Sequence, residues 1–209
     1  LTDLAPVTPM SASPYLSGVH PSLPVKSVRE LIVLAKARPG QLSYASSGVG
    51  SGIHLSTELL KRMVGIDMVH VPYKGSGPAL IDLVAGQIQL SMASMAAFMP
   101  HVRTGRIRAI AVTGVARSPV LPEVPTVAES GVPGYEAGTW NGIVVPARTP
   151  EAIVAKLNRD IVRALASPEI RELFSREGGE ASGGTPGELA RYIASEIAKW
   201  ATVVKAIGA

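Results

Sequence analysis

Two short loops rich in glycine and serine hold most of the chemistry that this sequence offers. They are Ser46-Ser-Gly-Val-Gly-Ser51 and Tyr73-Lys-Gly-Ser76, and each stands between a stretch that predicts a buried strand and one that predicts a helix. A helix start carries unpaired backbone N–H groups and a partial positive charge, and glycine lets a ligand approach the backbone closely. Serine hydroxyls add further hydrogen bonds. The pattern is typical of a carboxylate or phosphate site, although a single loop of this kind is more often an ordinary tight turn.

The same residues do not fit the motifs of nucleotide-binding proteins, hydrolases or metalloproteins. Ile53 stands where the dinucleotide fingerprint needs glycine or alanine, and the glycine that a P-loop places upstream of Lys74 is missing. Ser51 lacks the glycines two positions before and after it that a nucleophile elbow requires. The four histidines show no metal spacing, so a structural role is favoured for all of them. Lys74 fits either a solvated loop lysine or a ligand contact.

Composition excludes several further classes of protein. The chain has 209 residues, which fits one or two domains, and 46% of them are hydrophobic. It has no cysteine, which rules out disulfides, cysteine nucleophiles and cysteine-bound metal clusters. The net charge of +4 is dispersed and only 4% of the residues are aromatic, so a nucleic-acid surface is not expected. No apolar run approaches the ~18 residues of a membrane-spanning helix.

The elements that must position the two loops follow an alternation of strands and helices. A capping box at Ser27-Val-Arg-Glu30 starts a first helix, which Pro39-Gly40 ends. The pattern then predicts strands over 42–45, 68–71, 88–95 and 107–113, with helices over 53–64, 78–84 and 96–104 between them. Such an alternation indicates a parallel sheet, so both loops should lie at the carboxyl edge of their strands, where open α/β sheets bind ligands.

Outside this region the patterns are less regular. The first 27 residues are rich in proline and predict an extended segment with one short strand over 15–19 at best. Residues 114–138 are irregular and contain four prolines. The remaining chain predicts a strand over 139–145, helices over 151–166 and 168–177, a flexible break over 178–184, and a last helix over 187–206 with one continuous apolar stripe.

Longer stretches around both loops carry a resemblance to a known family. They are Tyr44–Leu55, Val69–Leu80, Arg106–Gly114, Leu121–Tyr135, Pro150–Asn158 and Trp200–Lys205. In this order, and over essentially the whole chain, they resemble the Bug family of periplasmic solute-binding receptors, the TctC-like substrate-binding components of tripartite tricarboxylate transporters. The resemblance implies an α/β, periplasmic-binding-protein-like fold of type II (a venus flytrap), in which a cleft between two lobes holds the ligand.

The resemblance also implies a function. A member of this family is a periplasmic protein that binds a small organic acid, such as a di- or tricarboxylate, and delivers it to membrane transporter subunits. It is not an enzyme, and it needs no cofactor or metal. It neither binds nucleic acid nor inserts into the membrane.

The resemblance divides the chain between two lobes. Residues 14–138 are expected to form the complete second ligand-binding lobe. Residues 1–13 and 139–209 then provide crossing segments and the C-terminal part of the first lobe. A full-length member has further sequence before Leu1, with a signal peptide and the first lobe's own ligand loop. We therefore expect the strand over 139–145 and the stripe of the last helix to be less buried than is usual.

The ligand residues that the resemblance implies coincide with the two loops, with one addition on the next strand. They are Ser46, Ser47, Gly48, Gly50, Ser51, Tyr73, Lys74, Gly75, Ser76 and Ser94. Many family members carry an acidic residue near Ala93, whereas Ser91-Met-Ala-Ser94 has none. The far end of the site is therefore expected to disfavour a ligand ammonium group and to accept an anionic or apolar tail.

Two functions of other classes remain alternatives. A ligand-sensing regulatory domain of a transcription factor or two-component system would share the two-lobed architecture. A helix-turn-helix segment would distinguish it, and none is visible in the sequence. An enzyme that uses Ser51 or Lys74 would need an acid or base within reach, and the sequence offers no convincing partner.

Overall fold

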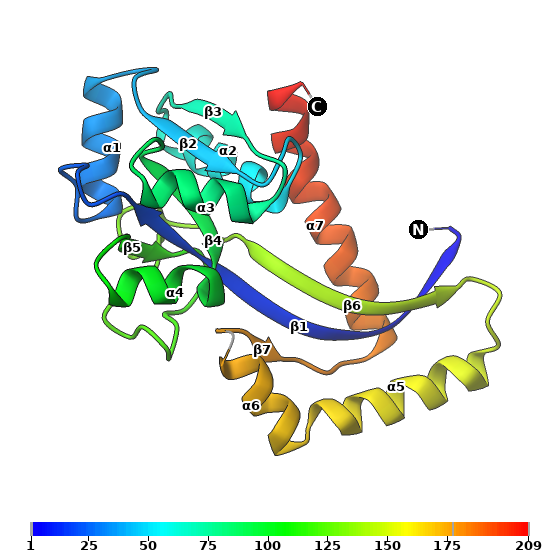
Figure 1. Ribbon diagram of the computed structural model, residues 1–209. Helices are drawn as coiled ribbons and strands as arrows, with labels where there is room; N and C mark the ends of the chain where they lie inside the picture. The colour runs from blue at the N-terminus through cyan, green and yellow to red at the C-terminus, as the bar shows by residue number, and fades with distance from the viewer. Residues whose placement is uncertain (1, 177, 209) are drawn as a thin grey trace. The chain divides into compact units, whose positions relative to one another are not determined.

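The computed structural model describes residues 2–176 and 178–208, and the chain forms two compact units (Figure 1). Unit 1 comprises the chain up to Ser13 together with Thr139–Thr202. Unit 2 comprises Pro14–Gly138 together with the chain from Val203 onward. The C-terminal residues therefore belong to unit 2, whereas the sequence had assigned all of 139–209 to the other lobe.

Strand β1 (Leu4–Val19) is much longer than the sequence indicated. Its residues Tyr15–Val19 pair with two neighbouring strands, and Ser11 and Ala12 pair with a third. The prolines of β1 lie outside these three registers, so these three pairings do not need the N–H group that proline lacks. The expectation of one short strand was wrong, because a proline prevents a ladder hydrogen bond only at its own position and not along the whole segment.

The sheet of unit 2 is built around two parallel strands whose ends carry the glycine- and serine-rich loops. Its order is β3 (Val69–Pro72), β2 (Ser43–Ser46), β4 (Leu90–Ser94), β1 and β5 (Arg108–Val112). Strand β2 is parallel to both β3 and β4, as the alternation predicted. Strand β1 runs antiparallel between β4 and β5, which local patterns could not reveal.

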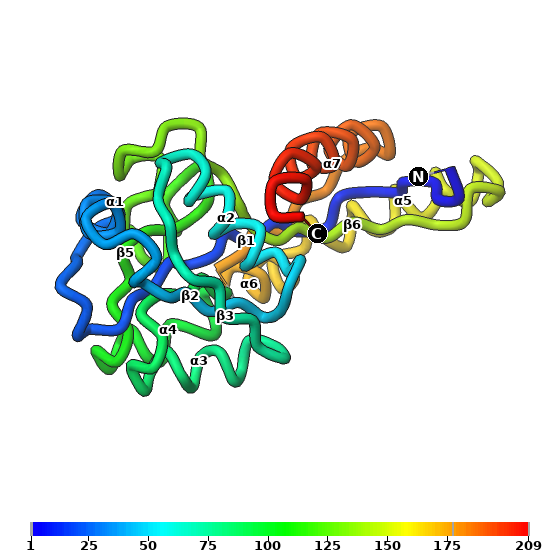
Figure 2. The backbone as a smooth tube through the Cα atoms, turned by 90° about the horizontal axis from the view of Figure 1, so that it is seen from above, coloured from blue at the N-terminus to red at the C-terminus, as the bar shows by residue number. Residues whose placement is uncertain are grey.

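Four helices cover the two faces of this sheet. Helices α3 (Ser76–Val84) and α4 (Met95–Arg103) lie on one face, and α1 (Val28–Ala37) and α2 (Gly52–Val64) lie on the other, as the two views together show (Figures 1 and 2). The α3–α4 side encloses a core of aliphatic and aromatic side chains that includes Leu16, Leu83, Phe98 and Val112. The predicted α/β class is therefore correct for this unit.

The ends of these helices follow local signals with two exceptions. The Ser27 side chain caps α1, but the Glu30 carboxylate accepts from the backbone N–H of Lys26 rather than from that of the cap residue. Gly65, in the left-handed region at φ 64°, ends α2 directly after residue 64, where the sequence placed the end of this helix. Helix α3 begins at Ser76, so Pro78 is its third residue and not its first.

The described residues of unit 1 contain the first part of β1, most of strand β6, a two-residue strand, two complete helices and most of a third. Strand β6 (Gly138–Pro146) and strand β7 (Glu180–Ala181) both pair with β1. The helices are α5 (Glu151–Leu165), α6 (Pro168–Arg176) and α7 (Pro186–Ile207). Strand β7 lies in the predicted flexible break, because two residues are too few to produce a periodic pattern. None of the described helices is long and apolar enough to span a bilayer.

Unit 1 leaves much of its apolar surface exposed, as the sequence led us to expect. No residue of β6 is fully buried. In the α7 stripe Leu189 and Ile193 are buried, but Ile197 is 57% exposed. Leu173 on α6 is 55% exposed. Among the described residues, this unit therefore has too few elements to cover its own apolar faces.

A buried threonine joins three segments of unit 2. The Thr113 hydroxyl is fully buried, accepts from the Tyr15 N–H at 2.7 Å and donates to the Ala137 carbonyl at 2.7 Å. The backbone of Thr113 adds two more hydrogen bonds, to the same two residues. This hydroxyl therefore satisfies one half-buried donor and one buried acceptor at the place where β1 and β5 meet the segment before β6.

We predict that Thr113→Val lowers the free energy of unfolding by about 2–4 kcal/mol, because it removes the hydroxyl that accepts from the Tyr15 N–H and donates to the Ala137 carbonyl. The matched control is Thr57→Val, where the equally buried hydroxyl only bonds back to the Ile53 carbonyl of its own helix. Urea denaturation measures the free energy of unfolding of both variants. Equal losses for the two variants would contradict this account of Thr113.

Candidate functional site

The structure brings the two predicted loops together at one edge of the sheet. Strands β2 and β3 are paired in parallel up to Ser46 and Pro72. Two hydrogen bonds continue the pairing into the loops, from the Tyr73 N–H to the Ser46 carbonyl at 3.0 Å and from the Gly75 N–H to the Ser47 carbonyl at 3.3 Å. Residues 46–51 and 73–76 therefore form one continuous surface beyond the carboxyl ends of the strands.

The first loop uses several of its own donors to hold its shape. The fully buried Ser46 hydroxyl accepts from the Gly48 N–H at 3.2 Å and lies 2.6 Å from Nε2 of His70. The Gly50 N–H donates to Nδ1 of His54 at 3.1 Å. The N–H groups of Gly48 and Gly50 are therefore not available to a ligand, although both glycines adopt positive φ angles that shape the loop.

Ser51 also serves the fold directly. It is the N-cap of α2, and its hydroxyl oxygen accepts from the His54 N–H at 3.3 Å. Its own N–H donates to the Gly48 carbonyl at 3.2 Å. The predicted anion contact by Ser51 can come only from the hydroxyl proton, which this capping bond leaves available.

The second loop has fewer internal partners. Gly75 is the N-cap of α3 at φ 109°, and no side chain caps this helix. Lys74 is exposed. The Tyr73 hydroxyl donates to the Asp82 carboxylate of α3 at 2.6 Å, and burial and this carboxylate raise its pKa to about 12. Tyr73 therefore stays neutral and directs its hydroxyl to the helix.

Several backbone donors at this edge remain open. Within the described part of the chain, no protein acceptor lies against the N–H groups of Ser47, Val49, Ile53, Ser76 and Gly77. Two of them are the first two residues of α3, where the helix adds partial positive charge. The arrangement suits a small anion that accepts several hydrogen bonds at once.

Two further residues reach this edge from other strands. Ser94 ends β4, is exposed, and caps α4 by accepting from the Ala97 N–H at 3.4 Å. The Tyr15 hydroxyl lies so close to Gly52 that a side chain at position 52 would collide with it. No sequence pattern indicates Tyr15 as a site residue, because its place depends on the antiparallel course of β1.

Three aromatic rings lie beneath the first loop. His54 and His70 stack at a centroid distance of 3.9 Å, and His70 also stacks on Tyr44 at 4.9 Å. Burial lowers the pKa of His54. Burial and the neighbouring His54 lower the pKa of His70 to about 4. Both imidazoles are therefore neutral near pH 7, in agreement with the structural role that the sequence favoured.

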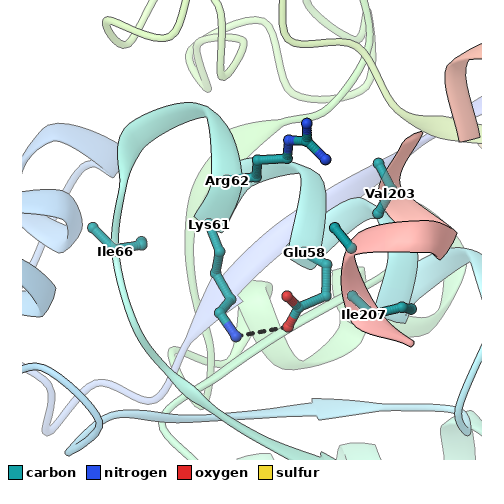
Figure 3. A pocket seen from close by; sticks show the side chains of 7 residues that line it. Glu58, Lys61, Arg62, Ile66, Val203 and Ile207 are labelled. Carbon is teal, nitrogen blue, oxygen red and sulfur yellow. Dashed lines mark hydrogen bonds and ion pairs between the residues drawn. The ribbon is translucent and has the colours of Figure 1, made fainter. Parts of the chain in front are cut away.

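A cavity of about 290 Å³ lies elsewhere in unit 2, between α2 and the last turns of α7 (Figure 3). Val203 and Ile207 of α7 face Glu58 of α2, which forms an ion pair with Lys61 at 2.7 Å. None of the predicted ligand residues lines this cavity. Across the residues that the structure describes, no group of three His, Asp or Glu side chains is placed to hold a metal ion.

Comparison with known sequences identifies related proteins. The profile of the tripartite tricarboxylate transporter family receptor matches residues 1–209. Protein BugT of Bordetella pertussis is 39% identical over 209 residues, which cover all of this chain and 64% of BugT. The UPF0065 protein of the tcbD-tcbE intergenic region of Pseudomonas sp. is 37% identical over 203 residues, which cover 97% of this chain and 60% of that protein. The chain thus spans less than two thirds of either relative.

Solved structures with the same fold include proteins with bound acids. R. palustris Rpa4515 with adipate is 42% identical, with a TM-score of 0.87 over 99% of this chain and 69% of that one. MatC from Rhodopseudomonas palustris with bound malate is 34% identical, with a TM-score of 0.82 over 96% of this chain and 69% of MatC. The periplasmic binding protein BugD is 29% identical, with a TM-score of 0.82 over 98% of this chain and 69% of BugD.

We predict that mild acid weakens unit 2 through its stacked histidines. The folded state binds a proton at His70 less tightly than the unfolded chain does, because the pKa of this histidine has its ordinary value of 6.5 when the chain is unfolded. The part of the folding free energy that depends on a neutral His70 is fully present above pH 6.5. It is lost as the pH falls from 6.5 towards about 4. Urea denaturation between pH 7.5 and about 5, above the range in which carboxylates titrate, should record this loss.

The variant His70→Gln should show a shallower slope over the same pH range, because glutamine does not titrate. A wild-type free energy of unfolding that stays constant between these pH values would contradict the prediction. So would an unchanged slope in the variant.

Proposed function

The chain belongs to the tripartite tricarboxylate transporter receptor family, and on that premise we propose that it is a solute-binding receptor for a small organic acid. The ligand carboxylate binds at residues 46–51 and 73–76, and no bond is made or broken. The protein works in the periplasm and delivers the acid to the membrane subunits of a tripartite transporter. Residues 14–138 act as the complete second ligand-binding lobe.

The observation that carries this proposal is the set of open N–H donors at the joined loops. Ser76 and Gly77 begin α3 without a side-chain cap, beside a first loop that the hydrogen bond from Gly75 to Ser47 holds in place. A hydrogen bond to a charged group contributes about 1.5–3 kcal/mol, so three or four such bonds are enough for micromolar binding after the costs of association.

The chemistry of the similar proteins agrees with a dicarboxylate as the ligand. Adipate and malate, named with two of the similar solved structures, are both dicarboxylates. In this chain, β4 offers no carboxylate between Ser91 and Ser94 that could hold a ligand ammonium group. We therefore propose that the far end of the ligand carries a second acid group or an apolar tail.

A ligand panel tests this preference. Isothermal titration calorimetry of the chain with adipate, malate, glutamate and alanine should give tighter binding for the two acids that lack an ammonium group. The physical reason is that an unpaired ammonium group loses its hydration without gaining a partner. Tighter binding of the two amino acids would contradict the proposal.

A proline substitution tests the backbone donors of α3. Ser76 is the first residue of the helix, where proline is tolerated because its N–H has no helical partner. We predict that Ser76→Pro weakens adipate binding by about 10- to 100-fold, which corresponds to one lost charge-assisted hydrogen bond. The matched control Ser76→Ala removes the hydroxyl and keeps the N–H. Equal affinity of Ser76→Pro and Ser76→Ala would mean that this N–H does not hold the ligand.

A further inference from the structure

The ring stack under the first loop joins three elements that surround it. Tyr44 comes from β2, His54 from α2 and His70 from β3. The two imidazole planes differ by 11°, and the planes of Tyr44 and His70 differ by 18°. His54 is only 5% exposed, and Tyr44 is fully buried. His70 therefore stacks on both of the other rings.

Each imidazole holds a different part of the loop. Nδ1 of His54 accepts from the Gly50 N–H at 3.1 Å, near the end of the loop. Nε2 of His70 lies 2.6 Å from the Ser46 hydroxyl, at the start of the loop. The same hydroxyl accepts from the Gly48 N–H at 3.2 Å, so the bond to His70 also fixes the middle of the loop. The stack thus sets the loop conformation at three points.

The hydrogen bonds specify how the protons are arranged. A backbone N–H can only donate, so Nδ1 of His54 carries a lone pair and its proton is on Nε2. A second proton on His54 would sit on Nδ1 and point at the Gly50 N–H, so two hydrogen-bond donors would oppose each other. His70 is more tolerant, because the Ser46 hydroxyl can either donate to it or accept from it while turning its own proton to the Gly48 carbonyl at 3.1 Å.

The charged groups around the stack belong to one cluster. Glu58 of α2 accepts from the Tyr44 hydroxyl at 2.5 Å and from Lys61 at 2.7 Å. Lys61 also donates to the Met68 carbonyl at 2.9 Å and lies over the Tyr44 ring at 5.4 Å. At His54 and His70 the glutamate raises the pKa and the lysine lowers it, so the two charges act in opposite directions.

We propose that His54 and His70 are positioning residues that hold the loop 46–51 in its ligand-binding conformation, His54 through Nδ1 and His70 through Nε2. The inference rests on the proposed function for the identity of the ligand, but the holding of the loop can be measured without one. Neither histidine needs to touch the acid. Their effect passes to it through Ser46, Gly50 and the open N–H groups of Ser47 and Val49.

Asparagine and glutamine distinguish the two ring nitrogens. The asparagine side-chain oxygen stands at the position of Nδ1, and the end of glutamine reaches the position of Nε2. His54→Asn should therefore keep the acceptor for Gly50, and His54→Gln should lose it. The order reverses at His70, where His70→Gln should keep the bond to Ser46 and His70→Asn should lose it. All four variants carry a neutral amide, so each pair is its own matched control.

The first readout is amide hydrogen exchange in the protein without ligand. The Gly50 amide should exchange about tenfold faster in His54→Gln than in the wild type, whereas His54→Asn should stay within about twofold. In the wild type, ¹⁵N NMR of the imidazoles should find the His54 proton on Nε2. A proton on Nδ1, or equal exchange in both His54 variants, would overturn the proposal. The NMR result decides the matter even if every variant fails to fold.

The second readout is the Kd for adipate. It should rise about tenfold in His54→Gln and in His70→Asn and stay within about twofold in the two partner variants. Equal weakening within each pair would mean that the rings only fill space. If the wild type binds neither adipate nor malate, the proposed function fails, and the exchange result alone decides whether the histidines hold the loop.

Discussion

The parallel pairing of β2 and β3, carried one step beyond the strands by the hydrogen bond from Tyr73 to Ser46, is the constraint on which the site depends. It brings two loops that are separated by a whole helix in the sequence to one edge of the sheet. The next bond, from Gly75 to Ser47, sets where α3 begins and therefore where its open N–H groups lie. Without this ladder, each loop would be an ordinary turn between a strand and a helix.

The two loops differ in how many of their N–H groups have protein acceptors, which their similar composition does not reveal. The first is held largely by its own bonds, because the N–H groups of Gly48, Gly50 and Ser51 all have protein acceptors. The second leaves the first turn of α3 uncapped. A rigid loop beside an uncapped helix start offers fixed donors to an anion without a large cost of ordering on binding. We interpret the buried histidines as the source of that rigidity and α3 as the source of the positive potential.

The sequence predicted those parts of the fold that depend on neighbouring residues. Helix α2 (Gly52–Val64) was predicted over 53–64, and the glycine that ends it, Gly65, is a local signal. The fold class and the family resemblance are confirmed. The start of α3 was misplaced, because a glycine cap such as Gly75 looks like any other loop glycine. The antiparallel course of β1 was missed, because it depends on pairing with strands far along the chain.

The candidate site shows the same division between local and long-range information. The glycine- and serine-rich loops are visible in the sequence, and their residues remain the predicted ligand contacts. The roles of Tyr15, His54 and His70 are not visible, because each depends on elements that meet only in the fold. The sequence also could not show that the N–H groups of Gly48 and Gly50 already donate to Ser46 and His54.

The most direct test is to map the bound acid on the backbone by NMR. A titration of the ¹⁵N-labelled chain with adipate should shift the amide signals of Ser47, Val49, Ser76 and Gly77 together, along one binding curve. The amides of Gly48 and Gly50, which already have protein partners, should move less. The account would be contradicted by shifts that gather instead around Glu58, Lys61 and Val203 at the cavity between α2 and α7, or by the absence of any shift at α3.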